Sequence, residues 1–211
     1  MANLTPEQAK QMLIAITEII ILNEPMLSEA DRLLGDGDHG IGMKRGFSAA
    51  AEELNALETM DSLSQPFKVA GMAMMSTMGG ASGAIFGSMY QGAAKGLKAF
   101  DELDSKALAV WLTDGLAKVV SVGGAKAGDK TMCDALIPAA AKAQEVQDLP
   151  IKEAIVLVAQ AAEDGKEASK AMLATMGRAK SLGEKSIGYP DPGACSVSLM
   201  LQAARDYIVS L

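Results

Sequence analysis

Residues 105–122 read SKALAVWLTDGLAKVVSV, and their apolar side chains recur at the three- and four-residue spacing of an α-helix. The apolar stripe consists of Leu108, Trp111, Leu112, Gly115, Val119 and Val122. The same spacing recurs near the end of the chain at Val197, Met200, Leu201, Ala204 and Ile208. No segment alternates apolar and polar residues as a half-buried strand does. The sequence therefore predicts an all-α fold with antiparallel neighbouring helices.

The boundaries of the other helices follow from start and stop signals. Thr5-Pro6-Glu7-Gln8 combines a capping hydroxyl, a proline at the first helical position and a glutamine placed for a capping box. Apolar periodicity and the helix start and stop signals together predict eight helices, over residues 5–23, 41–58, 66–78, 83–99, 105–122, 132–147, 151–175 and 194–211.

Composition restricts the class of protein. The 211 residues suffice for one domain with a sizeable core, so we expect 1–211 to be a single domain. The hydrophobic fraction of 49% contains only 4% aromatic residues and 14 methionines, which favours tightly packed helices. A net charge of −7 provides no basic face, which argues against nucleic acid and anionic membranes as partners.

Cellular location is indicated by three further features of the sequence. Cys133 and Cys195 have no metal-type spacing and are expected to be small core residues in a reducing compartment. The N-terminus lacks the basic region and cleavage site of a secretory signal. No uninterrupted apolar run approaches the roughly 20 residues of a membrane span. We therefore expect a cytoplasmic protein.

The connections between the predicted helices alternate in character. Those near 59–65, 100–104 and 148–150 are short and ordinary, whereas four others are rich in glycine and charge. The unusual connections are 31–42, 79–83, 123–131 and 176–193. Because alternate connections of an up-and-down bundle lie at the same end, the four unusual loops are predicted to converge on one rim.

The first of these loops, residues 31–42, contains the highest concentration of potential metal-ligating side chains. Asp31, Asp36, Asp38 and His39, the only histidine, lie within nine residues that are interspersed with glycines. Three adjacent carboxylates repel one another unless a cation lies between them, and a hard divalent ion prefers oxygen ligands. A solvated turn is the simpler alternative. The loop does not match the helix-loop-helix calcium pattern, which places a glutamate where this chain has Phe47.

The other three loops contain features that can bind a phosphate or a base. Gly79-Gly80-Ala81-Ser82-Gly83 opens a helix, so its amides can hold a phosphate, although small residues also permit a close helix crossing. In residues 123–132, Asp129 or Thr131 can cap the next helix, and Met132 can pack against a purine. Two divalent cations would only partly offset three carboxylates and a nucleoside diphosphate. The remaining positive charge would come from helix N-termini and from Arg178, Lys126 or Lys130.

Five separated motifs resemble one family over essentially the whole chain. They are GDGDHG at 35–40, GGASG at 79–83, GDKTMCD at 128–134, GRA at 177–179 and DPG at 191–193. In this order they resemble the nucleotide-binding subunits of bacterial dihydroxyacetone kinases. His39 favours this branch, because related fatty-acid kinase domains carry threonine there. Gly42 departs from the asparagine of some members.

The resemblance implies an eight-helix antiparallel up-and-down barrel with ADP and two Mg²⁺ at one end. It implies that the metal ligands are Asp31, Asp36 and Asp38. It also implies that the nucleotide is surrounded by His39, Gly40, Ile41, Gly42, Ala81, Ser82, Gly123, Met132, Arg178, Asp191, Pro192 and Gly193. Phosphoryl transfer needs mainly alignment and charge neutralisation, so Arg178 is the expected catalytic cation, and His39 is a catalytic residue expected to donate a hydrogen bond on the phosphate side.

Members without a fused substrate domain imply a particular reaction scheme. Tightly bound ADP is phosphorylated in place by a phosphohistidine carrier of the sugar phosphotransferase system. The phosphoryl group then passes to dihydroxyacetone on a partner subunit. Two alternatives remain open: an ATP-exchanging kinase subunit for a related ketose such as erythrulose, and a regulatory module that senses the nucleotide by binding a transcriptional regulator. A homodimer is a further candidate assembly.

Overall fold

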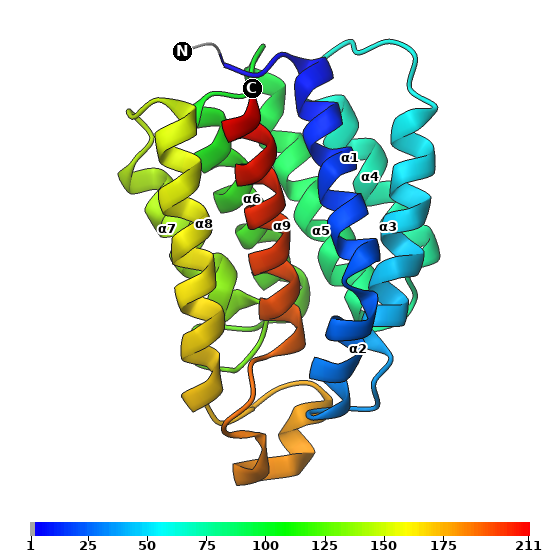
Figure 1. Cartoon of the computed structure of the whole chain (residues 1–211), viewed down its shortest axis with the longest axis vertical. Helices are drawn as coiled ribbons and strands as arrows, with labels where there is room; N and C mark the ends of the chain where they lie inside the picture. Colours follow the sequence, from blue (N-terminus) through cyan, green and yellow to red (C-terminus); the bar gives the residue numbers. More distant parts are fainter. Residues whose placement is uncertain (1–2) are drawn as a thin grey trace.

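The computed structural model describes residues 3–211, which form nine α-helices joined by short connections (Figure 1). The helices are α1 (Pro6–Leu22), α2 (Glu24–Arg32), α3 (His39–Asn55), α4 (Ser64–Thr77), α5 (Gly80–Gly96), α6 (Ser105–Gly123), α7 (Cys133–Glu145), α8 (Ile151–Ala168) and α9 (Pro192–Ser210). Three 3₁₀ segments are η1 (Leu97–Ala99), η2 (Ser169–Ala171) and η3 (Arg178–Ser186). Within residues 3–211 there is no strand, only an isolated bridge between Leu4 and Leu103, so the all-α prediction is confirmed.

Eight of the helices close into a ring. From α3 to α9 each helix packs against the next, α9 packs against α1, and α1 packs against α3. Neighbours in the ring run antiparallel (Figure 1). The remaining helix, α2, follows α1 after a bend of 55° and packs on α3. The predicted eight-helix antiparallel barrel is confirmed, and α2 extends it at the lower end.

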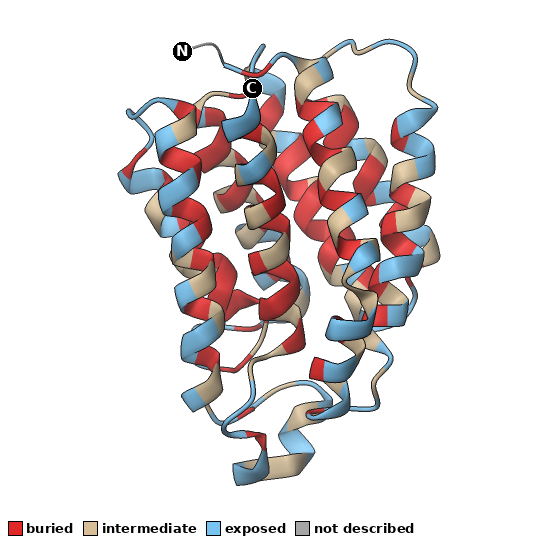
Figure 2. Cartoon of the chain, viewed as in Figure 1, coloured by how far each residue is buried: buried red, intermediate tan, exposed pale blue. Residues whose placement is uncertain are grey.

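The interior of the barrel is filled by alanine, leucine and methionine around a small aromatic group (Figure 2). Phe67 on α4 lies edge-on to Trp111 on α6, with 5.1 Å between ring centroids. Tyr90 on α5 lies 6.3 Å from Phe67 and 6.4 Å from Phe47 on α3. Four consecutive ring helices therefore share one aromatic contact set, of the offset kind that aromatic rings prefer.

Most helix boundaries lie within three residues of the sequence-based prediction, and two larger differences stand out. Helix α2 was not predicted, because it buries only Leu27 and Ala30 and so has little apolar periodicity. The helix expected over 151–175 ends at Ala168, followed by the single turn η2. The carbonyls of Ser169 and Met172 accept hydrogen bonds from the Lys130 ammonium, which ends the helical ladder there. The capping box at Thr5 and Gln8 is confirmed.

Over residues 3–211 no single helix is both long and apolar enough to cross a membrane. Helices α1 and α2 reach that length and composition only as a bent pair, and α1 buries its apolar face in the barrel.

The helices of the barrel approach one another closely at glycines. Gly165 on α8 faces the first turns of α7, where a β-carbon would overlap the carbonyl oxygen of Asp134 and lie 2.8 Å from the ring of Pro138. Gly42 on α3 is different, since a β-carbon there would meet its nearest neighbour at 3.8 Å.

We expect Gly165→Ala to lower the free energy of unfolding by about 1–3 kcal/mol, because backbone atoms of α7 must move to admit the methyl group. Gly42→Ala is the control and should be neutral or stabilising by up to about 1 kcal/mol, as alanine usually is within a helix. Urea unfolding of the nucleotide-free protein measures both. Equal effects of the two substitutions would contradict this account of the α7–α8 crossing.

Candidate functional site

The four unusual loops meet at one end of the barrel, as predicted. They surround a cavity of about 610 Å³, within the range of small-molecule sites. Every one of the four loops contributes lining residues, as do the adjoining ends of α2, α3, α5, α6, α7 and α9. Figure 1 shows these connections at the lower end of the molecule, opposite the N- and C-terminal ends.

The acidic loop is folded so that its three carboxylates face one another. Asp31 lies in the last turn of α2, and its carboxylate accepts the backbone N–H of His39 at 3.2 Å. Gly35 is needed because a β-carbon would lie 2.6 Å from Asp31 Oδ1, and Gly37 adopts a φ of +78°. One oxygen from each of Asp31, Asp36 and Asp38 lies within 4.8 Å of the others. Such an all-oxygen set suits a hard divalent cation.

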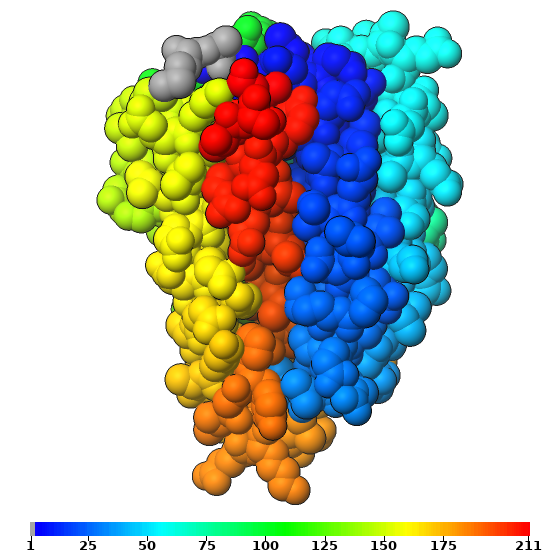
Figure 3. Space-filling view, viewed as in Figure 1, coloured from blue at the N-terminus to red at the C-terminus, as the bar shows by residue number. Residues whose placement is uncertain are grey.

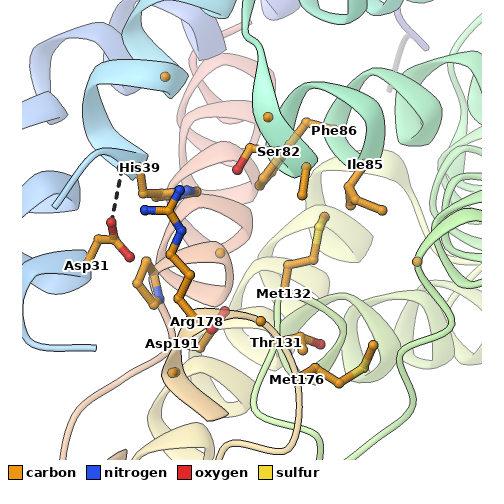
Figure 4. Close-up of a pocket in the computed structure, with 18 of the residues that line it drawn as sticks. Asp31, His39, Ser82, Ile85, Phe86, Thr131, Met132, Met176, Arg178 and Asp191 are labelled. Carbon is orange, nitrogen blue, oxygen red and sulfur yellow. Dashed lines mark hydrogen bonds between the residues drawn. The ribbon is translucent and has the colours of Figure 1, made fainter. Parts of the chain in front are cut away.

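Arg178 reaches this cluster from the segment between η2 and α9. It begins η3 and forms ion pairs with the Asp36 carboxylate and, at 3.5 Å, with Asp38. Its side chain lies beside Asp31 and His39 in Figure 4. The carboxylates thus attract a positive group, which supports the interpretation of the cluster as a cation site.

His39 is held in a fixed orientation at the start of α3. Its Nε2 lies 2.8 Å from Ser196 Oγ, and the Ser196 hydroxyl donates to the carbonyl of Pro192. This network assigns the proton to Nε2 and leaves Nδ1 as an acceptor. Burial lowers the pKa of His39, although the Asp31 carboxylate opposes this effect. The imidazole is therefore neutral at pH 7, with Nε2 engaged inside the protein.

The half of the cavity away from the carboxylates is apolar. Its walls come from α5, α6, the start of α7 and the segment before η3, and comprise Ile85, Phe86, Val119, Met132 and Met176 (Figure 4). Of these only Met132 was predicted. Ile85 and Phe86 could have been predicted from their position one helical turn after Ser82. Val119 could have been predicted from its position one turn before Gly123. An apolar wall with thioethers suits the flat face of a base.

The barrel topology also directs four helix N-termini toward the site. Helices α3, α5, α7 and α9 all begin at the lower end, where their free N–H groups favour negative charge. Helix α5 is entered through Gly79 and Gly80, whose φ angles of 74° and 60° favour glycine. An acidic protein can therefore present a locally favourable environment to phosphate.

Asp191 caps one of these helices. Its carboxylate accepts the N–H of Ala194 at 2.8 Å. Burial raises the pKa of Asp191 to about 7, the Asp134 carboxylate adds to the rise, and Lys130 opposes it. Neither Asp129 nor Thr131 caps α7 as its N-cap residue, a position that Met132 occupies.

Lys130 was one of three cations expected to help neutralise a bound anion, and that contribution stays a prediction. Its side chain is 1% exposed and donates to three backbone carbonyls, although it borders the cavity. Lys126 is not among the lining residues. Arg45, which sequence reasoning missed, lines the cavity one turn after Gly42.

The structure brings most of the predicted site residues to one cavity. Its lining includes Asp31, Asp36, Asp38, His39, Gly42, Ala81, Ser82, Gly123, Met132, Arg178, Asp191, Pro192 and Gly193. Gly40 and Ile41 do not line it. A β-carbon on Gly40 would overlap the carbonyl of Glu24 on α2, and Ile41 is 56% exposed in the first turn of α3. Their proximity to a nucleotide stays a prediction.

Known proteins with similar sequences are kinases and kinase subunits. The chain is 38% identical over 187 residues to the ADP-binding subunit DhaL of the PEP-dependent dihydroxyacetone kinase of Escherichia coli, covering 88% of this chain and 89% of that one. It is 36% identical over 208 residues to the ADP-binding subunit DhaL of the PTS-dependent dihydroxyacetone kinase of Lactococcus lactis, covering 97% and 99%. It is also 36% identical to the L-erythrulose 1-kinase of Mycolicibacterium smegmatis, of which it covers 33%.

The fold and the family are both matched. A crystal structure of the dihydroxyacetone kinase of C. freundii in complex with AMP-PNP and Mg²⁺ superposes with a TM-score of 0.73 at 25% identity over 94% of this chain. The present chain spans about a third of that longer one. Residues 33–206 match the DAK2 domain. The sequence similarities show that the chain belongs to the DAK2 domain family, and the cavity with its carboxylate cluster agrees with this assignment.

Proposed function

We propose that this chain is the ADP-carrying subunit of a cytoplasmic dihydroxyacetone kinase, with residues 1–211 forming its single nucleotide-binding domain. A phosphohistidine carrier of the phosphotransferase system is the phosphoryl donor, and dihydroxyacetone on a partner subunit is the acceptor. The observation that carries the proposal is the set of three carboxylates held within 4.8 Å at the mouth of an apolar cavity. The similarity to curated ADP-binding subunits over 88–97% of this chain supports it.

The residues present fit Mg²⁺ and a nucleoside diphosphate, and we propose two ions. Asp31, Asp36 and Asp38 would hold the ions, which when bound would neutralise charge on the phosphates. The glycine loop that opens α5, with the Ser82 hydroxyl, provides donors for phosphate oxygens. The apolar wall around Phe86 and Met132 provides the surface for the base.

Arg178 is the proposed catalytic residue. The carrier donates its phosphoryl group to the terminal oxygen of ADP, breaking a P–N bond and forming a P–O bond. The second transfer breaks that P–O bond and forms another to a hydroxyl oxygen of dihydroxyacetone, whose proton is released. Arg178, which the carboxylates hold at the cavity mouth, would stabilise the charge on the phosphoryl group in flight. His39 would fix Ser196 and the start of α9 through Nε2, and a hydrogen bond from His39 to a phosphate would require a proton on Nδ1.

A second candidate function is an ATP-exchanging kinase subunit for erythrulose, which the similarity to L-erythrulose 1-kinase favours. The two differ in nucleotide exchange, since only the first keeps ADP through the catalytic cycle. A transcriptional regulator and a second copy of the chain are further proposed partners.

Native mass spectrometry of the purified protein tests the proposed function directly. We expect a mass increment of one ADP and two Mg²⁺ that persists through gel filtration. Loss of nucleotide on the column, with activity restored by free ATP, would favour the exchanging kinase.

Asp36→Ala and Asp38→Ala are each expected to abolish retention of ADP while leaving the helical content unchanged, because each removes an oxygen ligand and no core atom. Asp101→Ala, an exposed carboxylate between η1 and α6 at the other end of the barrel, is the control and should retain ADP. Bound nucleotide and Mg²⁺ are quantified after gel filtration, and stoichiometric ADP in either site variant would refute the metal assignment.

Arg178→Ala should keep bound ADP yet lose on the order of 10³-fold in phosphoryl transfer, because its contact is made mainly in the transition state. Arg178→Lys should recover only part, since an ammonium lacks the planar fork of donors. Lys180→Ala, an exposed cation in the same 3₁₀ segment, is the control. Turnover is measured with carrier and dihydroxyacetone-bearing subunit in excess. Normal turnover of Arg178→Ala would exclude the catalytic role, and loss of ADP alone would reassign Arg178 to binding.

A further inference from the structure

Arg178 is carried by a long excursion of the chain, residues 172–190, which we call the strap. It leaves the barrel after η2, includes η3 and returns at the start of α9, and it forms the lower tip of the molecule in Figure 3, drawn in orange. Gly177, Gly183 and Gly188 have positive φ angles of 63°, 56° and 102°. The strap contributes little to the core of the barrel, so something else must fix its position.

The base of the strap is closed by its own hydrogen bonds. The N–H of Gly188 donates to the carbonyl of Lys170 at 2.7 Å, and the N–H of Asp191 donates to Ser169 Oγ at 3.0 Å. These bonds join the two ends of the strap to each other. They do not attach it to the loop between α6 and α7, which forms the neighbouring wall of the cavity.

Lys130 provides that attachment. Its ammonium donates to the carbonyls of Ser169 at 2.7 Å and Met172 at 3.2 Å, where the strap leaves the barrel, and to the carbonyl of Tyr189 at 2.7 Å, where it returns. All three protons of the ammonium are thereby used. Lys130 also has a φ of 58°, unusual for a residue other than glycine. One side chain therefore holds both ends of the strap.

A second attachment lies next to Lys130 in sequence. The carboxylate of Asp129 accepts the Thr175 hydroxyl at 2.7 Å, and the carbonyl of Asp129 accepts the Thr175 N–H at 3.2 Å. Thr175 is three residues before Arg178. The pair Asp129-Lys130 therefore fixes the strap at its two ends and at a point close to the cation.

A buried ammonium is costly unless it is fully hydrogen-bonded. Burial lowers the pKa of Lys130, while the nearby Asp191 and Asp134 carboxylates raise it. An apolar side chain of the same length would fill the space without that cost. The ammonium contributes three directional hydrogen bonds, and these fix the position of the strap.

We propose that Lys130 is a positioning residue for phosphoryl transfer: it fixes the strap through three carbonyls and so holds Arg178 over the carboxylate cluster. The inference rests on the proposed catalytic role of Arg178.

Lys130→Met keeps an unbranched side chain one atom shorter and removes the donors. We expect faster hydrogen exchange confined to residues 172–190 in the ADP-free protein, faster release of ADP, and a loss of roughly 10- to 100-fold in turnover per ADP-loaded site, the range typical of groups that orient a functional residue. Lys185→Met, an exposed lysine on the strap, is the matched control and should leave all three unchanged. Unchanged exchange and turnover in a folded Lys130→Met protein would overturn the proposal.

A double-mutant cycle separates positioning from general stability. If Lys130 acts through Arg178, the turnover loss of Lys130→Met combined with Arg178→Ala should be close to that of Arg178→Ala alone. Additive losses would overturn the proposal. If Lys130→Met fails to fold, Thr175→Val, at an exposed position, substitutes for it. Thr175→Val should give the same exchange pattern with a smaller loss of turnover, and wild-type exchange and turnover would overturn the proposal.

The same measurements separate the catalytic role of Arg178 from the positioning role of Lys130. Normal turnover of Arg178→Ala would refute the catalytic assignment made under the proposed function. Strong loss in Arg178→Ala with normal turnover and exchange in Lys130→Met would refute only the positioning role.

Discussion

Electrostatic repulsion among three carboxylates is the constraint on which the site depends. Asp31 is fixed by the last turn of α2, and the glycines of the next few residues bring Asp36 and Asp38 back toward it. Each positive element nearby is arranged around this cluster. Four helices begin at this end because the barrel alternates direction, and Arg178 reaches the cluster from the strap. The antiparallel order of the helices therefore determines which helix N-termini and loops surround the carboxylates at the rim.

Most of the fold was predictable because the barrel helices have a buried face. Helical spacing identified all eight ring helices, and the alternation of ordinary and unusual loops predicted their convergence. Helix α2 was missed because it buries only two side chains. The end of α8 was misplaced because a lysine that is distant in sequence binds the carbonyls of Ser169 and Met172. Local pattern carries no information about such a contact.

The candidate site was predictable where motifs lie in loops and less so on helix faces. Asp31, Asp36, Asp38 and Arg178 were selected by residue type, and the structure brings them together. Phe86 and Val119 resemble ordinary core residues in sequence, so only the closed barrel distinguishes a cavity wall from a core position. The hydrogen bonds of Lys130 were not predictable, because its left-handed backbone and its three carbonyl acceptors appear only in three dimensions.

The bridge between Leu4 and Leu103 places the beginning of the described chain at the pole opposite the rim, and α9 ends at the same pole (Figure 1). The length of the barrel therefore separates both ends of the described chain, residues 3 and 211, from the rim. Affinity tags, fluorophores or surface-attachment groups joined at either terminus would leave the rim open to large protein partners. The molecule can thus be immobilised by its ends with its reactive face oriented toward solution, which suits single-molecule and surface-based measurements of nucleotide release.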